Sequence, residues 1–284
     1  MACISTKIIL HNDVELPRIG LGTFRSKGAT VTAAVICAWN SGIEHIDTAS
    51  IYKNEDAIQR AIAAEDALDL FITSKVSPYE QGTQKASQAC QNILDRLKTE
   101  CVDLVLIHWP GAAHHALDSS AHAQLRLETW RVLEHFYTDG KFRAIGVSNF
   151  CESHLQELLA HAKIKPMVNQ IEVHPRYPQH QLRKLCKDNH IAVIAYSSLG
   201  IGDLLHHPIV LQVARDTQHT AAQVLLRWGL QQGCAVIPKS SNKQHIDEAS
   251  PNNLLSWELN QQQMQALDSM EDGHKYCWDP STVL

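Results

Sequence analysis

Short apolar runs alternate along the chain with longer segments whose apolar residues recur at helical spacing. The apolar runs cover about 19–23, 43–47, 69–74, 102–108, 143–148, 166–172, 191–197 and 234–238. Helical spacing follows each run, over about 28–42, 54–65, 84–99, 122–139, 151–161, 178–189, 208–231 and 243–250. Runs such as VDLVLI are apolar almost throughout, which is typical of parallel strands covered on both faces. The pattern predicts eight strands, each followed by at least one helix.

Eight consecutive βα units favour an α/β fold of the closed (β/α)8 type, the TIM barrel, over an open doubly wound sheet. Such barrels commonly run to about 250 residues as one unit, so we expect residues 1–284 to form a single domain. Two apolar runs within 7–22, separated by a turn at 11–13, predict an N-terminal β-hairpin. The irregular stretch from about 272 predicts a C-terminal tail loop over the active face.

Charge and composition exclude several classes of partner. The net charge is −5 and the sequence pI is about 6.4, so no basic surface is expected for nucleic acid or for an anionic membrane. No window approaches the roughly 18 apolar residues of a membrane span, and the N-terminus lacks the pattern of a signal peptide. The eight cysteines are scattered without a C-x-x-C pair. We therefore expect a cytoplasmic protein with reduced thiols.

Neither a metal site nor a Rossmann site is expected. The adjacent histidines at 114–115 and 206–207 have no cysteine or carboxylate cluster at ligand spacing, so the sequence predicts no metal. Gly20 and Gly22 form a G-x-G pair, but no third glycine opens a helix three residues later. A nicotinamide cofactor would therefore bind in another manner.

Four residues that could move a proton lie at or just after predicted strand ends. Asp47 ends the run IEHID, Lys75 ends FITSK, His108 ends VDLVLIH, and Tyr52 lies in the loop after Asp47. Because the carboxyl ends of parallel strands face the ligand, we expect these side chains to meet around a tuned tyrosine. Each residue also has a structural interpretation when taken alone. The alternatives are a buried ion pair for Asp47 and Lys75, a rim aromatic for Tyr52 and a core histidine for His108.

Eight stretches in the right order resemble the aldo-keto reductases over essentially the whole chain. They are PRIGLGTF (17–24), IDTASIYKNE (46–55), TSK (73–75), VDLVLIHWP (102–110), GKFRAIGVSNF (140–150), MVNQIEVHP (167–175), AYSSLG (195–200) and VIPKSS (236–241). The resemblance implies a barrel that binds NADP(H) across its C-terminal face and reduces aldehydes or ketones to alcohols without a metal. Tyr52 would be the general acid, Lys75 would lower its pKa, Asp47 would hold Lys75, and His108 would orient the carbonyl group.

The resemblance also implies a cofactor site. Tyr196 would stack on the nicotinamide, while Ser148, Asn149 and Gln170 would bind its carboxamide. Lys239 and Ser240 would meet phosphate oxygens, and Glu248 would contact the adenine. The full set of expected cofactor residues is Gly22, Thr23, Asp47, Ser148, Asn149, Gln170, Tyr196, Ser197, Leu199, Gly200, Lys239, Ser240, Ser241, Asn242, His245 and Glu248.

One departure from the family pattern bears on cofactor choice. His245 stands where members that prefer NADPH usually carry an arginine against the 2′-phosphate. A neutral imidazole is a poorer partner for phosphate than a planar guanidinium, although Lys243 or Asn242 could compensate. We therefore expect NADP(H) as cofactor, with weakened discrimination against NAD(H).

The expected substrate is a small-molecule carbonyl compound. Six residues are expected to line its pocket: Phe24, Ile51, Tyr52, His108, Trp109 and Trp278. The tail residue Tyr276 is a further candidate. We expect a monomeric enzyme. A non-catalytic NADP-binding regulatory or interaction subunit of the same fold is the alternative from another class, and the intact set of four proton-transfer residues argues against it. Within the enzyme class, an NADH-linked or keto-sugar reductase remains open.

Overall fold

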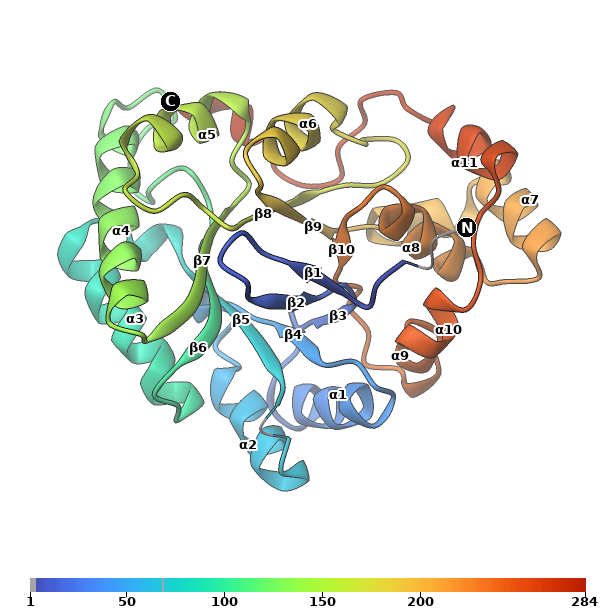
Figure 1. The fold of residues 1–284 in the computed structure, drawn as a ribbon, viewed down its shortest axis with the longest axis horizontal. Coiled ribbons are helices and arrows are strands. Elements are labelled where there is room, and N and C mark those ends of the chain that lie inside the picture. Colours follow the sequence, from blue (N-terminus) through green and yellow to red (C-terminus); the bar gives the residue numbers. More distant parts are fainter. Residues whose placement is uncertain (1–3, 68) are drawn as a thin grey trace.

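Eight parallel strands follow one another around a barrel, as the sequence predicts. The computed structural model describes residues 4–67 and 69–284. Each strand pairs with the next one in the chain, from β3 to β10 (Figure 1). The strands are β3 (Gly20–Gly22), β4 (His45–Asp47), β5 (Phe71–Val76), β6 (Val102–Ile107), β7 (Phe142–Ser148), β8 (Val168–Glu172), β9 (Ala192–Tyr196) and β10 (Ala235–Val236).

The first and last strands meet and close the barrel. Ile19 forms a parallel bridge with Val236, and the backbone N–H of Gly22 donates to the carbonyl oxygen of Pro238 at 2.9 Å. A Cβ atom on Gly22 would lie 2.9 Å from the carbonyl oxygen of Ile237. Only glycine therefore allows this close approach of the two edges.

Helices cover the outside of the barrel (Figure 1). They are α1 (Gly28–Asn40), α2 (Glu55–Glu65), α3 (Thr83–Leu97), α4 (Ala121–Thr138), α5 (Glu152–His161), α6 (His180–Asp188), α7 (Pro208–Thr217), α8 (Ala221–Gln231), α9 (Lys243–Glu248), α10 (Pro251–Leu255) and α11 (Gln261–Asp268). Four short 3-10 helices, η1 (Ser50–Tyr52), η2 (Pro78–Glu80), η3 (Gly200–His206) and η4 (Pro280–Thr282), lie in loops. The sequence did not predict α10, α11 or the 3-10 helices, and the strand expected over 234–238 has only two residues.

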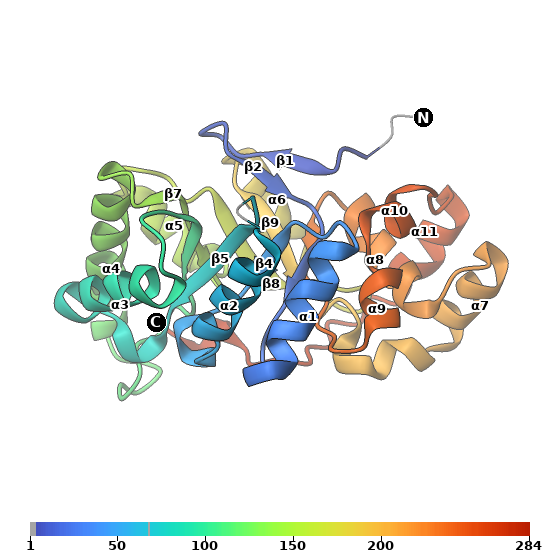
Figure 2. The same cartoon turned by 90° about the horizontal axis from the view of Figure 1, so that it is seen from below.

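The predicted hairpin lies across the N-terminal end of the barrel (Figure 2). Strands β1 (Lys7–Ile9) and β2 (Glu15–Pro17) pair antiparallel, and Asp13 turns the chain with a φ of 66°. The side chain of Leu16 is fully buried. Since this end is closed, ligands have access to the strands from the other end, where their carboxyl ends and the C-terminal tail lie.

The core explains why the strands read as continuous apolar runs. Leu104, Val105, Leu106 and Ile107 of β6 are all fully buried, because one face of the strand packs inside the barrel and the other meets helices. In the part of the chain that the structure describes, no helix combines the length and the apolar character needed to cross a membrane.

Candidate active site

A buried lysine and aspartate form the centre of the site. Asp47 is the last residue of β4, and Lys75 lies near the end of the neighbouring strand β5. Lys75 Nζ donates to Asp47 Oδ1 at 2.5 Å and to the carbonyl oxygen of Thr48 at 2.8 Å. Gln170 Nε2 donates to Asp47 Oδ2 at 2.7 Å. Since both charged side chains are buried, each supplies the partner that the other needs in a medium of low polarity.

Two rings cover this ion pair. Tyr52 ends η1, and the left-handed Lys53, with a φ of 53°, terminates that turn. The centre of the Tyr52 ring is 5.3 Å from Lys75 Nζ and 5.6 Å from the centre of the His108 ring, which it meets edge to face. The structure thus brings together the four side chains that the sequence places at strand ends.

The pKa of Tyr52 contradicts one expectation. The resemblance predicts that Lys75 lowers this pKa, whereas burial of the phenol raises it above its ordinary value and the negative charge of Asp47 raises it further. Burial is the larger of these two causes, and the second comes from the carboxylate that pairs with Lys75 at 2.5 Å. Tyr52 is therefore a protonated phenol at neutral pH.

His108 is neutral over the same pH range. Burial of the ring, with a further contribution from the positive charge of Lys75, lowers the pKa of His108 to about 3. Its Nδ1 atom is buried and has no hydrogen-bond partner among residues 4–67 and 69–284. A buried ring nitrogen without a partner is costly, and it suits a site that is completed by a ligand.

Next to these rings, a connected polar group joins the ends of β7, β8 and β9. Tyr196 donates its hydroxyl proton to Asn149 Oδ1 at 2.5 Å. Asn149, in the left-handed region at a φ of 64°, donates to the carbonyl oxygen of His108 at 2.9 Å. Ser148 Oγ donates to the carbonyl oxygen of Gln170 at 2.9 Å. The four predicted carboxamide and stacking residues therefore lie together beside His108.

The expected phosphate and adenine residues lie on an exposed loop and on the following helix. Lys239, Ser241, Asn242 and His245 are exposed. Asn242 Oδ1 accepts the backbone N–H of Gln244 at the start of α9. The carboxylate of Glu248 accepts hydrogen bonds from Gln244 at 3.0 Å and from Thr220 at 3.4 Å. Their role toward a cofactor remains a prediction.

The remaining expected cofactor residues have structural contacts of their own. Thr23 donates its hydroxyl proton to the carbonyl oxygen of Asp47 at 2.9 Å. Gly200 has a φ of 56°, and a Cβ atom there would lie 2.7 Å from the Tyr276 ring. Ser197, with a φ of 51°, and Leu199 precede η3 in the loop after β9. Gly22 lies at the seam of the barrel.

The expected substrate residues surround the two rings. The centre of the Phe24 ring is 5.2 Å from that of Tyr52, and Trp109 meets Trp278 edge to face at 6.5 Å. Phe24, Ile51 and Trp278 are 48%, 41% and 80% exposed. Such apolar exposure around a polar cluster is typical of a binding mouth. The Tyr276 ring packs instead against His174.

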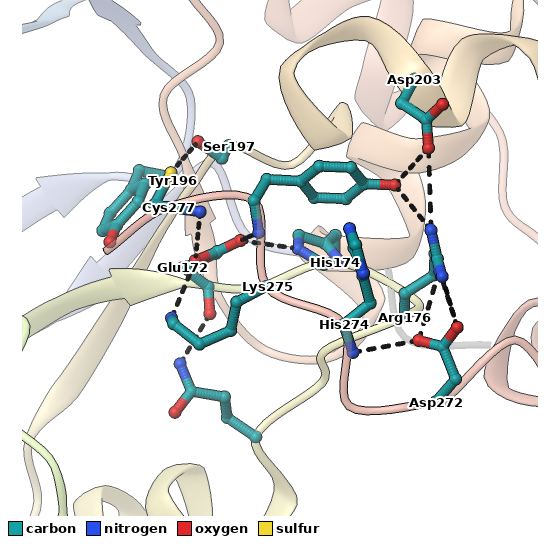
Figure 3. A network of polar contacts seen from close by, with 12 residues as sticks. Glu172, His174, Arg176, Tyr196, Ser197, Asp203, Asp272, His274, Lys275 and Cys277 are labelled. Atoms are coloured by element: carbon teal, nitrogen blue, oxygen red, sulfur yellow. Dashed lines mark hydrogen bonds and ion pairs between the residues drawn. The ribbon is translucent and has the colours of Figure 1, made fainter. Parts of the chain in front are cut away.

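The sequence analysis missed a second buried carboxylate, that of Glu172 at the end of β8 (Figure 3). Its carboxylate accepts hydrogen bonds from the Lys275 ammonium group at 2.8 Å and from His174 Nε2 at 3.0 Å. It also accepts the backbone N–H groups of Tyr276 and Cys277, at 2.6 and 3.3 Å. Burial opposes its ionisation, but these hydrogen bonds outweigh burial and lower the pKa of Glu172 to about 2. Its position at the end of an apolar run was the signal that could have found it.

No group of three or more metal-ligating side chains occurs among the described residues. The seven cysteines within those residues, at 37, 90, 101, 151, 186, 234 and 277, are free thiols.

Comparisons with known proteins agree over the full length of the barrel. The aldo/keto reductase family model matches residues 18–272. Glyoxal reductase of Bacillus subtilis is 42% identical over 281 residues, covering 97% of this chain and 96% of the relative. The 9,11-endoperoxide prostaglandin H2 reductase of Trypanosoma cruzi is 37% identical over 290 residues, covering 100% and 98%.

Solved structures lead to the same result. The crystal structure of MGS-M4, an aldo-keto reductase from a Medee basin deep-sea metagenome library, has a TM-score of 0.89 at 36% identity and covers 98% of this chain and 99% of that one. A mutant of Gox0644 in complex with NADPH has a TM-score of 0.89 at 31% identity and covers both chains completely. The chain belongs to the aldo/keto reductase family and is an oxidoreductase that reduces carbonyl groups.

Proposed function

We propose that this enzyme reduces small aldehydes and ketones with NADPH, and that Tyr52 is its proton donor. The observation that carries the proposal is the Tyr52 phenol above a buried Lys75–Asp47 pair, with the His108 ring meeting it edge to face. The NADPH complex of the Gox0644 mutant supports the choice of cofactor. A single cytosolic domain over residues 1–284, active as a monomer, is part of the same proposal.

The polar group at the ends of β7, β8 and β9 fits a nicotinamide carboxamide. After its bond to Asp47, Gln170 retains its carbonyl oxygen Oε1, which has no hydrogen bond within the described part of the chain. Asn149 Oδ1 accepts a single hydrogen bond, from Tyr196, and keeps a second lone pair. An amide NH2 group between these two acceptors would be fixed in orientation. The cofactor, when bound, supplies a hydride to the carbonyl carbon.

Proton transfer then depends on residues of the chain itself. Tyr52 donates its phenolic proton to the carbonyl oxygen, which gains negative charge as carbon is reduced. The phenolate that remains lies beside Lys75, and Asp47 keeps that lysine in place. The neutral His108 hydrogen-bonds to the same oxygen and orients it. General acid catalysis of this kind contributes about 10²–10⁴ in rate.

For the far end of the cofactor, we propose that Lys239, Ser240, Ser241 and Asn242 contact phosphate oxygens and that Glu248 contacts the adenine. His245 would meet the 2′-phosphate, as a weaker partner than arginine. Use of NADH in addition to NADPH follows from that weakness. The loop residues Ser197, Leu199 and Gly200, together with Gly22 and Thr23, would border the cofactor where it crosses the barrel.

For the substrate, we propose small carbonyl compounds that include glyoxal, because a relative 42% identical to this chain is a glyoxal reductase. The phenol of Tyr52 and the imidazole of His108 would bind the carbonyl oxygen. Phe24, Ile51, Trp109 and Trp278 would contact the rest of the molecule. Since three of these four apolar side chains are largely exposed, the mouth suits small or flexible substrates better than it suits a single rigid one.

The test is transfer of a label. We expect the enzyme to consume NADPH in the presence of glyoxal. When NADPH carries deuterium at the C4 position that is transferred, we expect the deuterium on the carbinol carbon of the product. Parallel reactions with NADH and without a carbonyl compound give the cofactor preference and the background. A panel of aldehydes, α-keto esters and keto sugars extends the test. If the protein binds NADPH tightly but consumes it with no member of the panel, the proposal is contradicted and a binding subunit is favoured.

A further inference from the structure

A cysteine lines a cleft next to Asn149 and Tyr196, the residues proposed to contact the nicotinamide. The cysteine is not one of the four proposed catalytic residues. The cleft has a volume of about 420 Å³ and lies among the start of α5, the start of α6 and the C-terminal tail. Cys151, Asn149 and Tyr196 line one part of it, and Lys275 and Tyr177 line another. Tyr52 and His108 do not line it. Cys151 is half-buried and forms part of the wall of the cleft.

His154 lies next to the sulfur in a geometry that identifies its tautomer. His154 Nε2 is 2.8 Å from the carbonyl oxygen of Val283, which can only accept a hydrogen bond, so this nitrogen carries the proton. His154 Nδ1 therefore presents a lone pair, which lies 3.1 Å from Cys151 Sγ and also accepts the backbone N–H of Cys151 in a longer contact of 3.4 Å. A nucleophile, a base within hydrogen-bond distance and a third group that orients the base are the arrangement of an activated thiol.

The surroundings of Cys151 also favour the thiolate. Burial opposes ionisation of the sulfur. Once His154 Nδ1 has accepted the thiol proton, it can donate a hydrogen bond back to the thiolate at 3.1 Å, and this contact together with Ser153 at 3.3 Å outweighs burial and lowers the pKa of Cys151 to about 7. Cys151 is also the N-cap of the ten-residue helix α5, whose N-terminal end favours negative charge. At Cys101 and Cys277, by contrast, burial is the dominant influence and the pKa of the thiol is raised.

We propose that Cys151 and His154 form a nucleophilic pair that binds small α-dicarbonyl compounds covalently and reversibly in this cleft. The thiol proton moves to His154 Nδ1, and Cys151 Sγ attacks the carbonyl carbon. A carbon–sulfur bond forms, the π bond of the carbonyl group breaks, and the proton returns from His154 to the oxygen. The product is a hemithioacetal, and the step needs neither an oxidant nor the cofactor.

The choice of ligand class follows from the chemistry of addition and from the cleft. A second carbonyl group withdraws electrons from the first and makes its carbon more electrophilic, so α-dicarbonyl compounds form such adducts more readily than simple ketones do. The lining offers little that would select a charged ligand, since Lys275 is paired with Glu172 at 2.8 Å and Glu152, Glu271 and Asp279 also border the cleft, so a small uncharged dicarbonyl compound is the better fit. A volume of about 420 Å³ is ample for a molecule of this size.

Alkylation of the intact wild-type protein by iodoacetamide tests the activation. Peptide mass spectrometry follows each cysteine as the pH is varied. We expect Cys151 to reach half its maximal alkylation rate near pH 7, while Cys101 and Cys277, which are also partly exposed, do so above the ordinary value of about 8.5. A half-rate pH at or above 8.5 for Cys151 would overturn the proposal and leave the cysteine as a helix cap.

Variants separate activation from capping. In His154→Gln the side chain keeps a donor for the Val283 carbonyl but is not a base, so we expect alkylation of Cys151 at pH 7 to fall about tenfold as the thiolate fraction drops. Cys151→Ser keeps a capping oxygen and removes the labelled peptide, which confirms the assignment. An unchanged rate in His154→Gln contradicts the pair. If His154→Gln does not fold, the wild-type pH profile decides alone.

Glyoxal is the probe for the ligand class. Glyoxal without NADPH should slow the alkylation of Cys151 at least fivefold more than that of Cys101 and Cys277, and dilution should restore the rate. Equal protection of all three cysteines, or none, would overturn the binding of α-dicarbonyl compounds at this cleft. This proposal and the proposed function can fail separately. If no deuterium is transferred from NADPH, the alkylation results are unaffected, because formation of the hemithioacetal involves no hydride.

Discussion

Two buried carboxylates at strand ends, Asp47 on β4 and Glu172 on β8, each hold a lysine and yet do different work. Lys75 Nζ lies 2.5 Å from Asp47, and Lys275 Nζ lies 2.8 Å from Glu172. The further partner of Asp47 is the side chain of Gln170 on β8, so its surroundings belong to the barrel. Glu172 instead receives two backbone N–H groups of the C-terminal tail.

The difference shows how similar ion pairs serve different purposes. At Asp47 every partner lies on a rigid strand, which fixes an ammonium group 5.3 Å from the centre of the Tyr52 ring. At Glu172 three of the four partners come from residues about a hundred positions later in the chain, so the carboxylate attaches a surface segment to the barrel. We infer that the first site determines the chemistry and that the second positions the tail, with Trp278, near the substrate.

The largest expected difference is in stability. Lys75→Met leaves the charge of Asp47 buried with Gln170 as its remaining partner, and we expect a loss of about 3–5 kcal/mol in the free energy of unfolding. Lys275→Met leaves Glu172 with three further donors, so we expect a loss of about 1–2 kcal/mol. Urea unfolding at pH 7 measures both. Equal losses would mean that the two sites tolerate an unpaired carboxylate equally well.

Acid should weaken the Glu172 site in a defined pH range. The pKa of Glu172 is lowered from 4.5 to about 2 in the folded protein, so its stabilisation is complete above about 4.5 and is lost as the pH falls toward 2. The shift corresponds to a contribution on the order of 3 kcal/mol. The difference in unfolding free energy between the wild type and Glu172→Gln should therefore be larger at pH 6 than at pH 3. A difference that does not change with pH would contradict this.

The same substitution should separate binding from chemistry. We expect Glu172→Gln to raise KM for a carbonyl substrate about tenfold, equivalent to about 1.4 kcal/mol, and to change kcat less than twofold, because the tail loses its anchor while Tyr52 and Lys75 are untouched. Glu271→Gln, which changes an exposed carboxylate, is the control. A fall in kcat with an unchanged KM would show that Glu172 acts on the chemistry and not on the tail.

The smallest effect is expected at the exposed end of the cofactor site. His245→Arg should raise the ratio of kcat/KM for NADPH to that for NADH about three- to tenfold, because a guanidinium group binds phosphate better than a neutral imidazole does, while solvent and salt screen the gain. Gln244→Arg adds the same charge one position away and should change the ratio less. If both variants change the ratio equally, the cofactor preference depends on the net charge of this region and not on a direct contact of residue 245 with the phosphate.

The sequence predicted the order of the βα units because each strand is buried on both faces and each helix has its own apolar face. It placed Asp47, Tyr52, Lys75 and His108 together because parallel strand ends converge. It did not predict α10 and α11, whose segments of five and eight residues are too short to show a clear helical repeat. The Glu172 contacts join residues 103 to 105 positions apart, which no local pattern reveals.

The pKa of Tyr52 lies above its ordinary value instead of below it, for a physical reason. Sequence alone indicates that an ammonium group is near, and a cation by itself would lower the pKa of a phenol. The outcome depends on burial of the ring and on a carboxylate 2.5 Å from that ammonium group, and both raise the pKa of Tyr52 relative to that expectation. Distances of this kind are set by tertiary packing.

The most direct test of the account is the rate of NADPH-dependent carbonyl reduction by Tyr52→Phe. The account predicts that kcat/KM falls about 10²–10⁴-fold while the Kd for NADPH stays within about twofold of the wild-type value, because the proposed cofactor contacts of Asn149 and Gln170 remain. Tyr79→Phe removes a hydroxyl from an exposed tyrosine and should leave both constants unchanged. A Tyr52→Phe variant that reduces carbonyl compounds as fast as the wild type would contradict the claim that Tyr52 is the proton donor.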